Sequence, residues 1–76
     1  MIMLRKSISR VIREHRRAAG ISQETLSERA GIHRTYISML ERGLKSPTLE
    51  VFSRIALALG AAPSKLLAEA EETHGP

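Results

Sequence analysis

The stretch from Gln23 to Glu41, QETLSERAGIHRTYISMLE, decides the fold of this chain. Its apolar side chains recur at helical offsets on both sides of a glycine, and they are Leu26, Ala30, Ile32, Ile37 and Leu40. Ser27 is small, as a close approach of two helices requires, and Gly31 can take the positive φ of a tight turn. Two short helices pack at a steep angle when such positions are small or apolar. The stretch therefore predicts two helices joined by a turn.

The rest of the chain is also predicted to be helical, because its apolar residues keep a helical period and strand-like alternation is nearly absent. Ser22 and Thr48 suit N-caps, and Pro63 suits a first helical turn, where a missing N–H costs nothing. The expected helices cover residues 4–19, 23–30, 49–59 and 63–70, and another starts at Arg34 and stops at Gly43. We therefore expect an all-α, compact five-helix bundle, with residues 1–70 as the domain and residues 71–76 as a disordered tail.

Length and charge limit the classes of protein that this chain can form. Its 76 residues make one domain, which without cysteine must be stabilised by helix packing, by dimerisation, or by both. Twelve lysines and arginines oppose eight acidic residues, which gives a net charge of +4 and a pI of about 10.4. A basic body favours a polyanionic partner such as nucleic acid. Solubilising surface charge is the alternative, and the charge alone does not decide between them.

Several function classes lack their sequence signals. The longest apolar runs are a few residues, far below the roughly 20 that span a bilayer, and no signal-peptide pattern is present. We therefore expect a cytoplasmic protein without membrane contact. The three histidines are scattered and predict no metal site. Ser38 has no His or Asp partner by spacing, and no glycine-rich phosphate loop exists, so we expect no catalysis, no cofactor and no small-molecule effector.

A specific set of residues, spaced along the chain from Ile21 to Gly60, matches the sequence pattern of a known family. They are Ile21–Glu24, Leu26, Ala30–Ile32, Tyr36–Ser38, Leu40–Gly43, Pro47, Ile55–Ala56 and Leu59–Gly60. At these positions the chain resembles the phage-repressor-like helix-turn-helix proteins, also called Cro/C1-type or XRE, over about residues 8–67. Within that family, His33–Ser38 and the short length are most similar to the controller proteins of restriction–modification systems. The resemblance implies a lambda-repressor-like DNA-binding domain whose third helix is the recognition helix.

The same resemblance implies which side chains would meet double-stranded DNA. Those that would point from the recognition helix toward base edges are His33, Arg34, Thr35 and Ser38. Arg34 is the best base reader, because its planar fork can donate two hydrogen bonds to O6 and N7 of a guanine. Those that would fix the register by binding phosphates are Arg17, Gln23, Arg42 and Lys45. Tyr36 would either contact the DNA backbone or pack against the protein.

Two structural expectations follow from the resemblance. Arg16 and Glu41 match positions that form a buried ion pair between the first and third helices in related repressors, and loss of one partner would cost about 3–5 kcal/mol. His33 stands where the family often has a capping Ser or Thr, and Ser27 stands where Ala is usual. Neither departure breaks the fold, but both leave open the angle at which the recognition helix approaches DNA.

The leading interpretation is a sequence-specific DNA-binding regulator of transcription, without catalysis, that binds a palindromic operator as a homodimer. Two recognition helices would lie about 34–36 Å apart, one turn of the duplex. The last two helices are the expected dimer surface, with the residues Phe52, Pro63, Leu66 and Leu67. Control of a restriction–modification operon is the expectation at the sub-family level. The alternative is a protein-interaction module such as an antitoxin, with a secondary DNA-binding role, and the short acidic tail argues against it.

Overall fold

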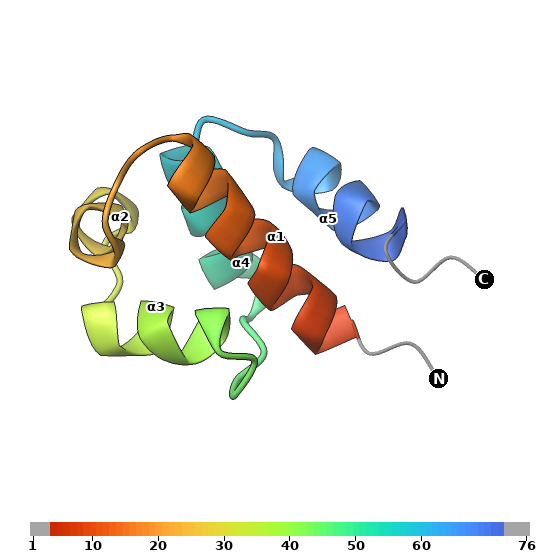
Figure 1. The fold of residues 1–76 in the computed structure, drawn as a ribbon, viewed down its shortest axis with the longest axis horizontal. Helices are drawn as coiled ribbons and strands as arrows, with labels where there is room; N and C mark the ends of the chain where they lie inside the picture. The colour runs from red at the N-terminus through yellow and green to blue at the C-terminus, as the bar shows by residue number, and fades with distance from the viewer. Residues whose placement is uncertain (1–3, 73–76) are drawn as a thin grey trace.

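The structure, a computed structural model, describes residues 4–72, and these form five helices with no strand among them (Figure 1). The helices are α1 (Leu4–Ala18), α2 (Gln23–Ala30), α3 (Arg34–Glu41), α4 (Leu49–Ala58) and α5 (Pro63–Glu72). In Figure 1, α1 runs diagonally across the molecule in front of α4, with α2 and α3 on one side and α5 on the other. The predicted all-α, five-helix fold class is confirmed.

Local sequence chemistry shapes the turn between α2 and α3. Ser22 is the N-cap of α2, and its Oγ accepts a hydrogen bond from a backbone N–H of the first turn at 3.0 Å. Gly31 ends α2 at φ 69°, a left-handed conformation that glycine adopts without a Cβ penalty. The N–H groups of Gly31 and Ile32 both donate to the Ser27 carbonyl, so the chain turns sharply. His33 takes the cap position of α3 without a side-chain hydrogen bond.

One apolar core receives side chains from every helix. The largest fully buried members are Ile12, Leu26, Ile37, Leu40, Ile55 and Leu66. Burying an aliphatic side chain of this size contributes about 1.5–3 kcal/mol. Within this core α2 packs on α3 and α4, while α1 packs on α3 and α5. The two short helices are therefore held on a scaffold formed by α1, α4 and α5.

The C-terminal end of the fold differs from the expectation. The helix α5 continues through Glu71 and Glu72, which the sequence pattern assigns to a disordered tail. The structure corrects this boundary: Ala70 is fully buried and anchors a last turn, and alanine and glutamate are strong helix formers. Residues 73–76 of the expected tail lie outside the described residues. The other helix ends fall within about two residues of the prediction, the usual scatter of such boundaries.

Within residues 4–72, no single helix is long and apolar enough to cross a membrane. Taken together, α4 and α5 reach the required length and apolar composition, but this pair is bent by 103° at the break between the two helices.

Candidate nucleic-acid interface

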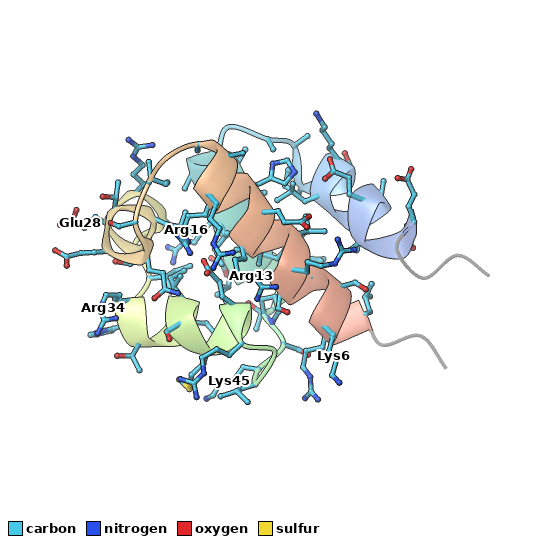
Figure 2. The ribbon with its side chains drawn as sticks, viewed as in Figure 1. Lys6, Arg13, Arg16, Glu28, Arg34 and Lys45 are labelled. Carbon is cyan, nitrogen blue, oxygen red and sulfur yellow. The ribbon has the colours of Figure 1, made fainter. Side chains whose placement is uncertain are left out.

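The surface of α3 divides into an inner and an outer face. Ile37 and Leu40, three positions apart and therefore on one side of the helix, are at most 1% exposed. Arg34 and Thr35 are exposed, and Ser38 is half-buried one turn further on. Figure 2 shows Arg34 at the N-terminal end of α3, pointing away from the body of the protein. The outer face of α3 therefore presents a guanidinium and two hydroxyl groups to an external partner.

The shape and chemistry of the outer face suit the edges of base pairs. An α-helix with its side chains is about 10–12 Å across, which matches the major groove of B-DNA at about 12 Å. A guanidinium can donate two parallel hydrogen bonds to a guanine, and a hydroxyl can either donate or accept. His33 is exposed at the start of α3 and places an imidazole beside these groups. The outer face thus carries donors and acceptors that can discriminate between bases.

A buried ion pair joins α1 to α3. Arg16 Nε lies 2.6 Å from Glu41 Oε2, and Arg16 Nη2 lies 2.9 Å from Glu41 Oε1, a two-pronged arrangement. The two side chains are only 12% and 3% exposed. The hydrogen bonds to Glu41 raise the pKa of Arg16 above its ordinary value, and they outweigh burial, which lowers it. Arg16 is therefore held in its charged form and in one geometry.

Further contacts extend this ion pair into a polar junction formed by Arg13, Arg16, Gln23 and Glu41. Arg16 Nη1 donates to the carbonyl oxygen of Ile21, just before α2, at 2.9 Å. Arg13 Nη1 donates to the carbonyl oxygen of Glu41, at the end of α3, at 2.8 Å. Gln23 Nε2, in the first turn of α2, donates to Glu41 Oε1 at 3.2 Å. The polar junction therefore fixes α1, the start of α2 and the end of α3 relative to one another.

The cations among the residues expected to bind phosphates lie on the surface of the molecule. Arg17, Arg42 and Lys45 are exposed. Lys45 Nζ lies 5.9 Å from the centroid of the Tyr36 ring, a cation–π contact, while Tyr36 itself packs against the core. Gln23 gives one amide hydrogen to the polar junction, which leaves its second one for a phosphate. The structure thus gives Tyr36 a packing role and leaves the three cations accessible.

Sequence reasoning missed two roles within the polar junction. Arg13 stands three residues before Arg16 and so shares its face of α1, a signal that was present in the sequence. The inward bond of Gln23 is harder to foresee, because it joins residues that are 18 positions apart. Gln23 therefore has a structural contact in addition to the phosphate contact that the resemblance implies.

The residues expected at a dimer surface divide between the interior and the surface. Phe52 and Leu66 are 5% and 0% exposed in the single chain, and this burial corrects their assignment. Both stabilise the bundle and leave little area for a partner, because the neighbouring helices already cover them. Pro63 and Leu67 are half-buried. Among residues 4–72, the most exposed large apolar side chain is instead that of Leu49, at 82%, in the first turn of α4.

An apolar groove of about 310 Å³ adjoins Leu49. It lies between the start of α1, the loop before α4, α4 itself and α5, and its apolar lining includes Leu4, Ile8, Pro47, Leu49, Phe52 and Leu67. Removing apolar surface of this kind from water by contact with a partner is energetically favourable. The groove is therefore a candidate contact surface, separate from the outer face of α3.

A second polar contact links α1 to α5. His15 Nε2 lies 2.8 Å from Glu69 Oε1, and the two side chains are 26% and 36% exposed. Among the residues that the structure describes, no three His, Asp or Glu side chains gather closely enough to hold a metal ion.

This fold and this site match a known class of protein. A family model described as helix-turn-helix matches residues 12–66, which include α2, α3 and the turn between them. Because this match spans most of the chain, the chain belongs to the helix-turn-helix family. The resemblance to Cro/C1-type regulators, inferred from the sequence, is confirmed.

Individual relatives show which kinds of helix-turn-helix protein the chain is similar to. An uncharacterized HTH-type transcriptional regulator of Methanothermobacter thermautotrophicus is 52% identical over 50 residues, 66% of this chain and 72% of the relative. Control protein C.SmaI of Serratia marcescens is 36% identical over 64 residues, 84% of this chain and 76% of the relative. The restriction-modification controller protein C.Esp1396I, solved as a tetramer in complex with its natural 35 base-pair operator, is 28% identical with a TM-score of 0.84, over 91% of both chains. The chain is thus similar to regulators, controller proteins among them, over most of its length.

Proposed function

We propose that this chain is a sequence-specific DNA-binding regulator of transcription that binds a palindromic operator as a homodimer. The observation that carries the proposal is the outer face of α3, where Arg34, Thr35 and Ser38 lie together on a helix whose inner face is packed. The polar junction supports it, because it holds this face in one orientation relative to α1 and α2. The protein acts by binding, not by catalysis.

The contacts of this regulator fall into two groups. Base edges are read by His33, Arg34, Thr35 and Ser38. Phosphates are bound by Arg17, Gln23, Arg42 and Lys45, while Tyr36 packs against the core. Contacts of the second group fix the register without selecting a sequence, and each releases counterions from the duplex. Affinity for every duplex should therefore fall steeply as the salt concentration rises.

Control of a restriction–modification operon is the more specific proposal. It is supported by the similarity to C.SmaI and to C.Esp1396I, which extends over 84% and 91% of this chain. C.Esp1396I was also solved in complex with its operator. We place the regulator in the cytoplasm, because it must meet DNA to act.

The homodimer is proposed to form through the apolar groove, with Leu49 and Leu67 at the contact. Pro63, in the first turn of α5, does not line the groove. Leu49 is 82% exposed, and full burial of a leucine gains about 1.5–3 kcal/mol. A two-fold arrangement uses the same surface on both chains, and the proposal requires it to hold the two α3 helices about 34–36 Å apart. This separation matches two half-sites on one face of a duplex.

Selection of bound duplexes from a random pool tests the proposed function. We expect an inverted repeat with half-site centres about 10 base pairs apart, bound by two chains or a multiple of two. Native mass spectrometry on the selected duplex would give the stoichiometry. Recovery of no preferred sequence, or of a single half-site bound by one chain, would contradict the proposal.

The dimer surface has its own test in a pair of leucine variants. Leu49→Ser should raise the dissociation constant of the dimer, measured by sedimentation, by about tenfold or more, because it removes apolar area from the contact. Leu57→Ser is the matched control, since Leu57 is 65% exposed on the same helix but does not line the groove. Equal effects of the two substitutions would place the contact elsewhere.

A further inference from the structure

A second hollow lies beside α3, between the first half of α1 and the turn that follows α3. It measures about 370 Å³, opens to solvent, and is bordered by the four cations Lys6, Arg10, Arg13 and Arg42. Ser9, Glu41 and Gly43 also border it. Of the four cations, only Arg42 is among the phosphate contacts of the proposed function, and Arg13 belongs to the polar junction. We refer to this feature as the cationic hollow.

The cationic hollow is positively charged because its one acid is already neutralised. The Glu41 carboxylate is bonded within the polar junction, and its side chain is only 3% exposed. Arg10 lies 3.2 Å from Glu14, but both side chains are well exposed, and such surface pairs contribute little. Within the described residues, the Lys6 ammonium and the Arg42 guanidinium make no hydrogen bond or ion pair. An anion that enters therefore meets cations that are available to bind it.

Packing of α1 against the end of α3 brings these cations together. A Cβ placed on Gly43 would lie 3.6 Å from Ser9 Oγ and 3.8 Å from Lys6 Cγ, so the stem of Lys6 follows the turn closely. Arg13 is held by its 2.8 Å bond to the Glu41 carbonyl oxygen. The cluster of charge therefore depends on the same helix contact that positions the outer face of α3.

One cation of the cationic hollow, Lys6, lies on the side on which α3 would meet DNA. Figure 2 shows Lys6 and Lys45 along the edge of the molecule that α3 forms, with Arg34 at the other end of that edge. The helix α5 lies on the far side of α1 (Figure 1). A duplex carries a negative charge about every 1.7 Å along its axis. A duplex that lies along α3 therefore brings phosphates to both ends of this edge.

We propose that the cationic hollow seats a phosphate group of the operator backbone, an inference that rests on the proposed function. The Lys6 ammonium supplies a compact charge, and the guanidinium groups of Arg10 and Arg42 supply planar donor forks that match phosphate oxygens. The hollow is open along one side, so it admits a phosphate that is part of a chain. The contact fixes the position of α1 on the duplex and selects no sequence.

A matched pair of double variants tests this proposal. Lys6→Gln with Arg10→Gln removes two positive charges at the hollow, and Arg54→Gln with Lys65→Gln removes two from exposed positions on α4 and α5. Affinity for the selected operator would be measured by fluorescence anisotropy across a range of salt concentrations. We expect the slope of log affinity against log salt to fall by about 1 for the first pair and to stay unchanged for the second. Lys6→Gln alone, on an exposed side chain, should show the same direction of change.

The source of the phosphate is tested on the DNA side. Duplexes with one neutral methylphosphonate at successive positions should include a position in each half-site that weakens the native protein but not the Lys6→Gln, Arg10→Gln variant. Inorganic phosphate, compared with chloride at equal ionic strength, should weaken operator binding more for the native protein than for the double variant, because it competes for the hollow. The same selective effect without any methylphosphonate position that distinguishes the two proteins would assign the hollow to a free anion and overturn the proposal.

Failure of this proposal can be separated from failure of the proposed function. If the native chain prefers an operator and the two double variants have equal slopes of log affinity against log salt, the proposed phosphate contact in the hollow is wrong. The proposed sequence-specific binding is then unaffected. If the native chain binds no duplex, both are wrong. Thermal unfolding followed by circular dichroism would show that each double variant keeps the native fold.

Discussion

The helix α1 meets α3 and α5 through two contrasting contacts. Toward α3 it offers the polar junction, in which Arg16 and Glu41 are joined by bonds of 2.6 and 2.9 Å. Toward α5 it meets an apolar core in which Leu66 and Ala70 are fully buried, beside a partly exposed contact between His15 and Glu69. Hydrogen bonds depend on distance and angle, whereas hydrophobic burial has no preferred direction. The core therefore holds the bundle together, and the polar junction sets the direction of α3.

The largest expected effect comes from breaking the polar junction on one side. Glu41→Ala leaves the largely buried Arg16 without its carboxylate, so the free energy of unfolding should fall by about 3–5 kcal/mol. Urea titration followed by circular dichroism would measure it. The control is Glu50→Ala, on an exposed side chain, which should change the free energy by less than about 0.5 kcal/mol. Similar losses in the two variants would show that the ion pair is not a structural element.

Weakening the apolar contact between α1 and α5 should destabilise the fold without changing which DNA sequences the protein prefers. Leu66→Ala removes a fully buried side chain from α5 and should lower the free energy of unfolding by about 2–5 kcal/mol. At a temperature where the variant is still folded, it should rank a set of operator variants in the same order as the native protein. A changed order would mean that the core, too, directs the outer face of α3.

Replacing the ion pair by apolar side chains should change stability least and should specifically reduce the preference among operator sequences. Arg16→Met with Glu41→Leu replaces the ion pair by apolar side chains of similar size, which often leaves stability nearly unchanged, here by less than about 1 kcal/mol. The substitution also removes the bond from Arg16 to the Ile21 carbonyl oxygen and the bond from Gln23 to Glu41, which tie the start of α2 to α1 and to α3. Preference among operator variants should therefore fall while non-specific binding stays. If this variant keeps its full preference among operator variants, the polar junction does not set the orientation of α3.

Much of the fold can be predicted from the sequence because its signals are local. Ser22 and Gly31 mark the start and end of α2 by capping and by a positive φ, and the helical period separates the buried Ile37 from the outward Thr35. These features depend on residues within a few positions of one another. Local signals of this kind account for the five helices and for the outer face of α3.

The rest depends on contacts between distant segments. Burial of Phe52 and Leu66 is decided by which helices cross over them, so a pattern along α4 or α5 does not separate core from dimer surface. The bond between Arg13 and the Glu41 carbonyl joins residues 28 positions apart. The extension of α5 follows from burial of Ala70, a residue too small to give a strong apolar signal.

The central claim, that the outer face of α3 reads bases, is tested most directly by titrating two variants against every single-base variant of the selected operator. Arg34→Ala should cost about 1–3 kcal/mol on the best operator and abolish the preference at one position in each half-site. Lys45→Ala should weaken binding to all duplexes by the same factor, because a phosphate contact carries no sequence information. A uniform loss for Arg34→Ala, with every base preference intact, would contradict the account.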